Sequence, residues 1–414
     1  MPQRYLKPHW EFNLNICVGC ENYSVKKYLD FGLQTITNRF LKAPISTQEE
    51  FKHPLQLGFC DHCGLTQLLN AAPIEEVRTR FDWVRYNEAE GHLDDLVETL
   101  YQLPDVTPQA SILGLSENDT SSLLRLNKKG FYKAAGLSLK SDLGMDVPLD
   151  GLGIVQEYFT DETIKEIKKI HHPNIIIARN ILEHARNPLK FLTALHTLLQ
   201  PDGYIVFEVP DNEPFFRNYD YSVVWEEHIL YFTPFSFLNF IKNNGFDIQF
   251  FKIYPHSMEN SLVMIARVKP NDSTPSHDGG KIKNEYDQIL KYSSMFLTQK
   301  DFYRKVLLWY KKMGKKIALM GASHLACHFI NLMEIADTLE FIVDDHPCKS
   351  GLFMPGSQLS ILPSRALIEN KIDICLLSLS SESEKKVIIK KSDFIESGGM
   401  FFSIFPTSEI ALKE

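Results

Sequence analysis

The sequence has no long apolar run and no excess of basic residues. No stretch approaches the roughly 20 apolar residues that a helix needs to cross a bilayer, and residues 1–7 lack the apolar core of a signal peptide. The formal net charge of -8 gives no general attraction to nucleic acid or to an anionic membrane. We therefore expect a soluble, cytoplasmic protein that binds neither nucleic acid nor a membrane.

Internal repeats are also lacking, so the 414 residues are not explained by copies of one small unit. Apolar residues make up 44% of the chain and aromatic residues 12%, which is enough to build sizeable cores. A chain of this length is usually divided into two or three compact domains.

Cysteine is sparse, but four of the seven residues form two CxxC pairs. Cys17 and Cys20 make the first pair and Cys60 and Cys63 the second, with 39 residues between the two pairs. Two such turns can present four thiolates to one zinc ion. The alternatives are a redox pair, for which a thioredoxin-like βαβ unit is missing, and four unrelated buried cysteines. The spacing predicts a structural zinc site.

Between residues 111 and 268, short apolar segments alternate with amphipathic ones. The segments that we predict as strands are 111–115, 132–136, 153–157, 175–178, 204–209 and 262–267, and the predicted helices include 89–103, 161–170 and 188–199. This alternation predicts a mostly parallel, doubly wound sheet. The loop 114–120 lies between a strand and a helix, where a nucleotide-like cofactor can bind at the helix N-terminus.

A cluster of acid, base and aromatic groups follows the strand at 204–209. It contains Trp225, Glu226, Glu227 and His228. Active groups in α/β proteins often lie beyond the carboxyl ends of strands, so this cluster is a candidate catalytic site. The alternative is an exposed acidic turn with a structural histidine.

A second strand-turn-helix unit follows a polar Pro/Gly/Ser-rich stretch at 270–280 and a long amphipathic segment at 286–312. Its strand at 316–320 leads into Gly321, and a strand at 339–344 ends at Asp344, about 23 residues later, the spacing that ribose binding uses. The turn holds one glycine and not three, so plain structural use of this unit is the alternative.

In this order the motifs resemble the S-adenosylmethionine (SAM)-dependent C-methyltransferases that carry an N-terminal zinc-binding module, a family that includes enzymes methylating nucleotide-linked 4-keto-deoxysugars. The resemblance covers almost the whole chain. The motifs are the two CxxC pairs, Ser-Glu-Asn-Asp-Thr at 116–120, Ala-Arg-Asn-Ile-Leu-Glu-His at 178–184, Glu227-His228 with Tyr231-Phe232, and the pattern Asp344, Pro347, Lys349, Gly351 and Pro355-Gly356.

The resemblance implies an α/β fold with a Rossmann-like class I methyltransferase sheet between a zinc-binding module and a second Rossmann-like domain. The expected domains are a zinc-binding module at 1–80, a methyltransferase-like domain at 81–268, a linker at 269–284 and a C-terminal Rossmann-like domain at 285–414. The expected cofactors are SAM and a structural zinc ion held by Cys17, Cys20, Cys60 and Cys63. The expected substrate is a small molecule, nucleotide-linked.

The cofactor residues that the resemblance implies lie after three strands: Leu115, Ser116, Asn118, Asp119, Ser138, Arg179 and Asn180. The chain departs from the family pattern at several of these positions. Gly114 replaces an acid, Ser116 and Thr120 replace glycines, and Ser138 replaces the acid that holds the cofactor ribose. Trp225 and Glu226 stand where the family has tyrosine and histidine.

The catalytic residues that the resemblance implies are His228, Glu227 and His184, because methylation beside a ketone needs a base near neutrality. Tyr86, in the aromatic passage after the second CxxC pair, is a further catalytic candidate because its phenol can donate a proton. A structural role is the alternative for His184, and simple packing for Tyr86. The leading hypothesis is methylation of a carbon next to a ketone with His/Glu base catalysis. The alternatives are a diverged homologue that acts as a binding or assembly protein and a cofactor-free proton-transfer enzyme.

Overall fold

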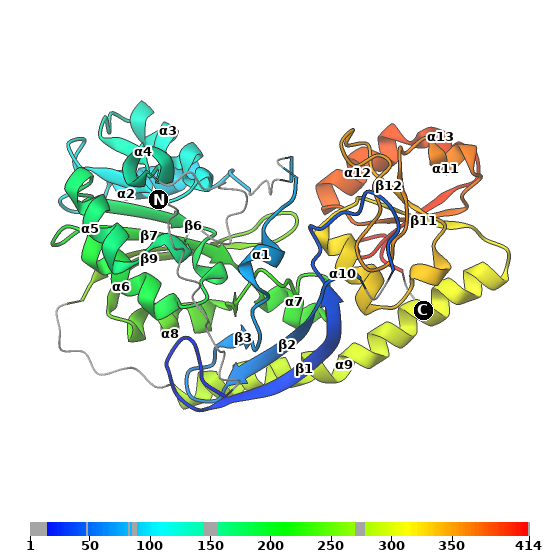
Figure 1. Cartoon of the computed structure of the whole chain (residues 1–414), viewed down its shortest axis with the longest axis horizontal. Helices are drawn as coiled ribbons and strands as arrows, with labels where there is room; N and C mark the ends of the chain where they lie inside the picture. Colours follow the sequence, from blue (N-terminus) through cyan, green and yellow to red (C-terminus); the bar gives the residue numbers. More distant parts are fainter. Residues whose placement is uncertain are drawn as a thin grey trace.

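Three β-sheets organise the chain (Figure 1). The computed structural model describes residues 15–46, 49–81, 83–84, 89–144, 156–269 and 278–412. Two α/β bodies lie side by side, and a four-stranded sheet from the N-terminal region lies between them, along the same side as the long helix α9 (Gly279–Lys312). No helix in these ranges is long and apolar enough to span a bilayer.

The central sheet has six strands in the order β5-β4-β6-β7-β10-β9. Four are parallel: β4 (Ile112–Gly114), β5 (Ala134–Gly136), β6 (Ile175–Arg179) and β7 (Tyr204–Pro210). The last two, β9 (Phe246–Tyr254) and β10 (Ser261–Val268), form an antiparallel extension. Every residue of β6 is buried, as expected for a central strand covered on both faces.

Helices cover both faces of this sheet. Helices α2 (Leu93–Tyr101) and α3 (Thr120–Lys128) bury their apolar stripes against one face, and α5 (Asp161–Ile170) and α6 (Pro188–Leu198) against the other. A capping box at Thr160 starts α5, and Asn187 caps α6. A further short helix of this half is α4 (Leu139–Leu143). The carboxyl ends of the parallel strands thus meet at one edge, where loops carry the candidate site.

The N-terminal module is an antiparallel sheet completed by a distant segment. Strands β1 (Val25–Thr35), β2 (Lys52–Cys60) and β3 (Thr66–Leu68) are followed by a short helix, α1 (Ile74–Val77). The fourth strand, β8 (Leu230–Tyr231), comes shortly after the cluster 225–228 in the chain and pairs with β3. The candidate catalytic loop therefore ends inside the sheet of the zinc-binding module.

The C-terminal body is a five-stranded, wholly parallel sheet in the order β13-β12-β11-β14-β15. Its strands are β11 (Ile317–Met320), β12 (Ile342–Val343), β13 (Ile361–Leu362), β14 (Ile374–Leu377) and β15 (Met400–Ser403), and its helices are α10 (His324–Leu332), α11 (Ala366–Glu369), α12 (Ser381–Lys390) and α13 (Ser392–Glu396). Reversal of the strand order at β11 is the Rossmann-like arrangement.

Helix α9 contacts all three parts of the chain. Tyr286 packs against Tyr28 of β1, and the hydroxyl of Tyr221 donates to the carbonyl of Tyr292 at 2.7 Å. Tyr303 packs on Phe329 of α10. Helix α9 begins at Gly279, which lies within the range 269–284 that was predicted as a linker. Two more helices, α7 (Glu213–Asn218) and α8 (Pro234–Asn243), flank the catalytic loop.

The predicted fold class is confirmed: an α/β chain with a Rossmann-like sheet, a small module carrying the four cysteines and a second parallel sheet. Within the central sheet, β9 was missed, and the strands of the N-terminal module and β13 to β15 of the C-terminal sheet were not predicted. The predicted strand at 153–157 lies mostly outside the described residues, and its last two residues begin a single 3-10 turn. The helix predicted at 89–103 is shorter, Leu93–Tyr101.

Candidate active site and metal centre

The four paired cysteines converge on one point. The Sγ atoms of Cys17 and Cys63 lie 3.6 Å apart, those of Cys20 and Cys60 lie 3.7 Å apart, and all four lie within 4.8 Å of one another. Thiolates around a tetrahedral zinc ion with Zn–S bonds of about 2.3 Å are roughly 3.8 Å apart. The donor set and the spacing fit a closed structural zinc site, as predicted.

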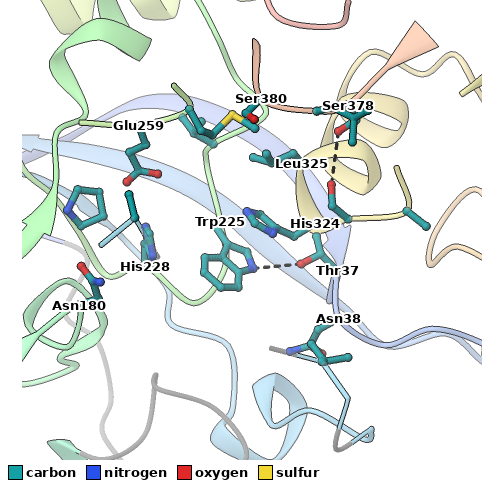
Figure 2. A pocket seen from close by; sticks show the side chains of 18 of the residues that line it. Thr37, Asn38, Asn180, Trp225, His228, Glu259, His324, Leu325, Ser378 and Ser380 are labelled. Atoms are coloured by element: carbon teal, nitrogen blue, oxygen red, sulfur yellow. Dashed lines mark hydrogen bonds between the residues drawn. The ribbon is translucent and has the colours of Figure 1, made fainter. Parts of the chain in front are cut away.

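A cavity of about 780 Å³ lies where the three parts of the chain meet. Thr37 and Asn38 line it from the N-terminal module, Asn180 and His228 from the central body, and Ser378 from the C-terminal body (Figure 2). Further lining residues include Trp83, Glu183, His184, Trp225, Met258, Glu259, Ser323, His324, His346, Lys349 and Ser380. The cavity thus lies between the two Rossmann-like units, and the N-terminal module forms part of its wall.

Trp225 and Glu226, where the chain departs from the family pattern, join the three modules. The indole N–H of Trp225 donates to the hydroxyl of Thr37 at 3.1 Å, and its ring stacks on His324 at 4.6 Å (Figure 2). One carboxylate oxygen of Glu226 accepts from the Thr37 backbone N–H at 2.6 Å, and the other lies 3.1 Å from Nε2 of His328. These two side chains therefore hold the cavity wall together.

His184 lies in the 3-10 turn Leu182–His184 directly after β6, with its ring buried. Its Nδ1 lies 2.9 Å from the carbonyl oxygen of Glu227. A carbonyl can only accept, so Nδ1 carries the proton and Nε2 keeps its lone pair. Burial, partly opposed by that hydrogen bond, lowers the pKa of His184 to about 4. The imidazole is therefore neutral near pH 7 and able to take a proton.

His228 borders the cavity beside His184. The two ring centroids are 4.7 Å apart with the rings nearly perpendicular. Burial and the neighbouring imidazoles of His184 and His324 keep the pKa of His228 well below its usual range. Both predicted bases thus come together as neutral imidazoles.

The Glu227 carboxyl group is hydrogen-bonded to the N-terminal module. It accepts from the amide of Asn38 at 2.7 Å, and burial together with the charge of Glu226 raises its pKa well above the usual value. Glu227 orients His184 through its backbone carbonyl, a role that the sequence did not reveal. Tyr86 lies outside the described residues.

The predicted cofactor loop is held by its own side chains. The Asp119 carboxylate accepts from the backbone N–H groups of Leu115, Ser116 and Arg179 at 2.8 to 3.1 Å. The Arg179 side chain is buried, where it pairs with Glu208 at 2.5 Å and donates to the carbonyl of Asn118 at 2.6 Å. Asp119 and Arg179 therefore hold the loop that follows β4 against the end of the neighbouring strand β6.

Two of the departures from the family pattern have local explanations. A Cβ at Gly114 would lie 2.8 Å from the Cβ of Asp119, so glycine allows the loop to pack against its strand. Ser138 caps α4 by accepting from the Ser141 backbone N–H at 3.2 Å, and it does not line the cavity. Ser138 thus serves the helix in place of the ribose-binding acid.

Two amide groups at this edge fit a bound cofactor. Among the described residues, the side-chain nitrogens of Asn118 and Asn180 are buried with no hydrogen-bond partner. They follow the adjacent strands β4 and β6, and Asn180 has the left-handed φ of 52° and lines the cavity. A ligand with hydrogen-bond acceptors, such as the carboxylate or ribose of SAM, would satisfy both donors.

The C-terminal wall combines a helix N-terminus with a lysine. Ser323 caps α10, and its hydroxyl lies 3.4 Å from that of Ser378 (Figure 2). Lys349 pairs with Asp344 at 2.9 Å, and the same oxygen of Asp344 accepts from the Ala322 backbone N–H at 2.9 Å. The acid predicted for ribose binding thus holds the turn and positions Lys349.

Three models of known protein families match successive parts of the chain. They are described as "Putative zinc binding domain" (residues 17–77), "Methyltransferase domain" (residues 127–249) and "C-methyltransferase C-terminal domain" (residues 281–406). C-methyltransferase NovU of Streptomyces niveus is 20% identical over 96% of this chain and 97% of its own.

Solved structures give weaker matches. A SAM-dependent methyltransferase of Methanosarcina mazei is 11% identical with a TM-score of 0.28, covering 42% of this chain and 97% of its own. The 1,6-didemethyltoxoflavin-N1-methyltransferase of Burkholderia thailandensis is 15% identical with a TM-score of 0.28, covering 45% of this chain and 94% of its own.

The order of the domains and the site at their junction define a SAM-dependent methyltransferase with a structural zinc ion. Within that class, the chain is similar to the C-methyltransferases: it matches a zinc-binding domain and a C-methyltransferase C-terminal domain on either side of its methyltransferase domain.

Proposed function

We propose that the protein methylates a carbon next to a ketone in a nucleotide-linked sugar or a related small intermediate. In this proposal His184 and His228 are the two candidate general bases. The observation that carries the proposal is the pair of neutral imidazoles at the cavity. Because Nδ1 of His184 donates its proton to the Glu227 carbonyl, Nε2 of His184 is unprotonated and can accept a proton. A neutral imidazole is suited to removing a proton from a carbon beside a carbonyl.

The C-terminal wall supports a phosphate-bearing substrate. Lys349 supplies a cation, and the N-terminus of the nine-residue helix α10 lies on the same wall with the hydroxyls of Ser323 and Ser378. Helix N-termini and lysines together favour phosphate groups. A nucleotide diphosphate on this wall would place the attached sugar ring toward the histidines.

The proposed cofactor site is at the loops after β4 and β6, where Asn180 also lines the cavity. Asn118 and Asn180 would hold SAM at the carboxyl ends of β4 and β6, while Asp119 and Arg179 keep the loop in shape. When bound, SAM supplies an electrophilic methyl group. The protein removes the α-proton with an imidazole and keeps the resulting enolate away from bulk water in the cavity.

A test of the base separates proton removal from methyl transfer. A nucleotide-linked 4-keto-deoxysugar in deuterium oxide should exchange its α-proton with the wild-type protein, and His228→Ala should slow this exchange by about 100-fold or more. His346→Ala removes a cavity imidazole that contacts neither histidine and should exchange normally. Unchanged exchange in His228→Ala would overturn the assignment of the base.

A cofactor-free proton-transfer enzyme remains the second candidate, because Asp119, Arg179 and Ser138 are engaged in protein contacts rather than directed at a ligand. Calorimetry with SAM and S-adenosylhomocysteine on zinc-loaded protein distinguishes the two. Binding that Asn180→Ala weakens at least tenfold supports methyl transfer, whereas exchange without any cofactor binding supports the second candidate.

A further inference from the structure

A second group of metal-ligating side chains lies in the cavity wall, apart from the four cysteines. One ligand atom each from Glu183, His184 and His228 lies within 4.8 Å of the other two. Glu183 and His184 are almost fully buried, at 1% and 4% exposure, and His228 borders the cavity. Because none of these residues belongs to the zinc-binding module, this would be a separate site.

The backbone fixes the two loops that carry these residues. The Ile229 N–H donates to the carbonyl of Glu183 at 2.7 Å, which ties the turn after β6 to the catalytic loop. The hydroxyl of Tyr231 accepts from the Trp225 N–H and donates to the Trp225 carbonyl, both at 2.9 Å. The three ligands thus come from a rigid frame, as a preorganised metal site requires.

His184 has the arrangement typical of a metal ligand. Its Nδ1–H donates to the Glu227 carbonyl at 2.9 Å, which fixes the ring and directs Nε2 toward Oε1 of Glu183, 3.9 Å away. Metal-bound histidines usually donate their second ring N–H to a carbonyl or carboxylate in this way. Ligand atoms around an ion at 2.0 to 2.2 Å are roughly 3 to 3.5 Å apart, so small side-chain rotations suffice.

The cavity side of the cluster holds an unsatisfied donor. The Asn180 side chain is 6% exposed, and its amide nitrogen has no hydrogen-bond partner among the described residues. Asn180 lines the cavity with Glu183, His184 and His228 (Figure 2). It could donate to a water or substrate oxygen on an ion held by the three ligands.

We infer that Glu183, His184 and His228 bind a divalent transition-metal ion with one or more coordination positions open to the cavity. Two imidazole nitrogens and one carboxylate oxygen suit ions such as Zn²⁺, Co²⁺, Ni²⁺ and Fe²⁺. The ion and the proposed base reaction need the same nitrogen lone pairs, so they exclude each other. This consequence for catalysis rests on the proposed function, whereas metal binding itself does not.

Cobalt(II) is the probe for this site. Untagged protein with its cysteine site filled by zinc is titrated with Co²⁺, and the expected result is one further ion per chain whose absorption spectrum lacks thiolate charge transfer. Glu183→Gln and His228→Ala should each weaken this binding by about 100-fold or more. His346→Ala, which removes another cavity imidazole, should leave it unchanged.

The outcomes separate this inference from the proposed function. Thermal unfolding of each variant shows whether it is folded, and Glu183→Gln preserves the shape of the side chain. Absence of a second ion, or binding that persists in both ligand variants, overturns the metal site. A further outcome is that the protein binds Co²⁺ but, when its cavity holds no metal, does not exchange the α-proton of the substrate. That outcome would overturn the proposed base reaction and would leave the metal site supported.

Discussion

Single residues in this chain have roles that depend on which neighbour they meet. Arg179 resembles a cofactor-binding residue in the sequence, yet its guanidinium pairs with Glu208 in the interior, and Glu208 also lies 3.1 Å from His92. Burial alone would raise the pKa of Glu208, but the hydrogen bond to His92 and the charge of Arg179 outweigh it and hold the pKa at about 2. This ion pair is a structural support beneath the cofactor loop.

The Glu208 pair should make stability depend on pH in the acid range. Because the folded pKa of about 2 is below the ordinary 4.5, the contribution is fully present above pH 4.5 and is lost as pH falls toward 2. At 1.36 kcal/mol per pKa unit this is about 3 kcal/mol. In urea unfolding from pH 7 to pH 3, the difference between wild type and Glu208→Gln should shrink.

Glu166→Gln is the matched control for this measurement, because Glu166 pairs with Lys169 on the surface of α5 and is largely exposed. Surface pairs contribute little, so its difference from wild type should stay nearly constant with pH. A constant difference for Glu208→Gln as well would contradict the role of the ion pair.

Helices and strands with a local sequence signal were predicted well, whereas strands that depend on a distant partner were not. The CxxC pairs, the buried strand at 175–178 and the helix at 161–170 each carry their own signal within a few residues, and the structure has them in place. Strand β9 was missed because seven of its nine side chains are exposed or half-buried, which obscures the alternation of apolar and polar residues. Strand β8 has two residues and exists only because β3 lies beside it.

The same limit applies to the candidate site. The sequence marked His184 and His228, but the directions of Trp225 and Glu226 depend on Thr37, His324 and His328, which are about 100 to 190 positions away. Glu183 was not predicted as a ligand of the proposed metal site, because its partner His228 lies 45 positions further along the chain. Sequence spacing alone carries no information on such contacts.

Zinc removal should affect catalysis through β8. Chelation of the zinc, or Cys60→Ser, loosens the sheet to which β8 is paired, and β8 follows His228 by two residues. We expect zinc loss, a lower melting temperature and a loss of methyl transfer of at least tenfold. Elemental analysis and activity measured on the same samples provide the check.

Cys348→Ser is the matched cysteine control, because Cys348 is exposed and lies far from the four-cysteine cluster in the chain. It should keep its zinc and its activity. Full activity in protein shown to be free of zinc would contradict the coupling through β8.

At the scale of the whole molecule, the cavity exists because three modules meet. Glu226 connects them through Thr37 of the N-terminal module and His328 of the C-terminal body, all buried. Removing one partner of a buried pair leaves a polar group without compensation, which typically costs several kcal/mol. The closed arrangement of the modules therefore depends on this one loop.

A double-mutant cycle tests this connection. Glu226→Gln and His328→Gln, alone and combined, should show a coupling energy of about 1 kcal/mol or more in unfolding measurements. The exposed pair of Glu382 and Lys386 in α12 offers a matched cycle, in which about 0.3 to 0.5 kcal/mol is expected. Equal coupling in the two cycles would mean that the buried contact contributes nothing special to holding the modules together.

The pairing of β8 with β3 also bears on how such a chain can evolve. Two residues from beyond the catalytic loop complete the sheet of the first module, with Tyr231 opposite Thr66 and Leu230 opposite Gln67. Recombination that exchanged this module for another would have to preserve that register as well as the cysteines. The modules are thus expected to be inherited together, and a hybrid joined at residue 80 would inherit a broken sheet.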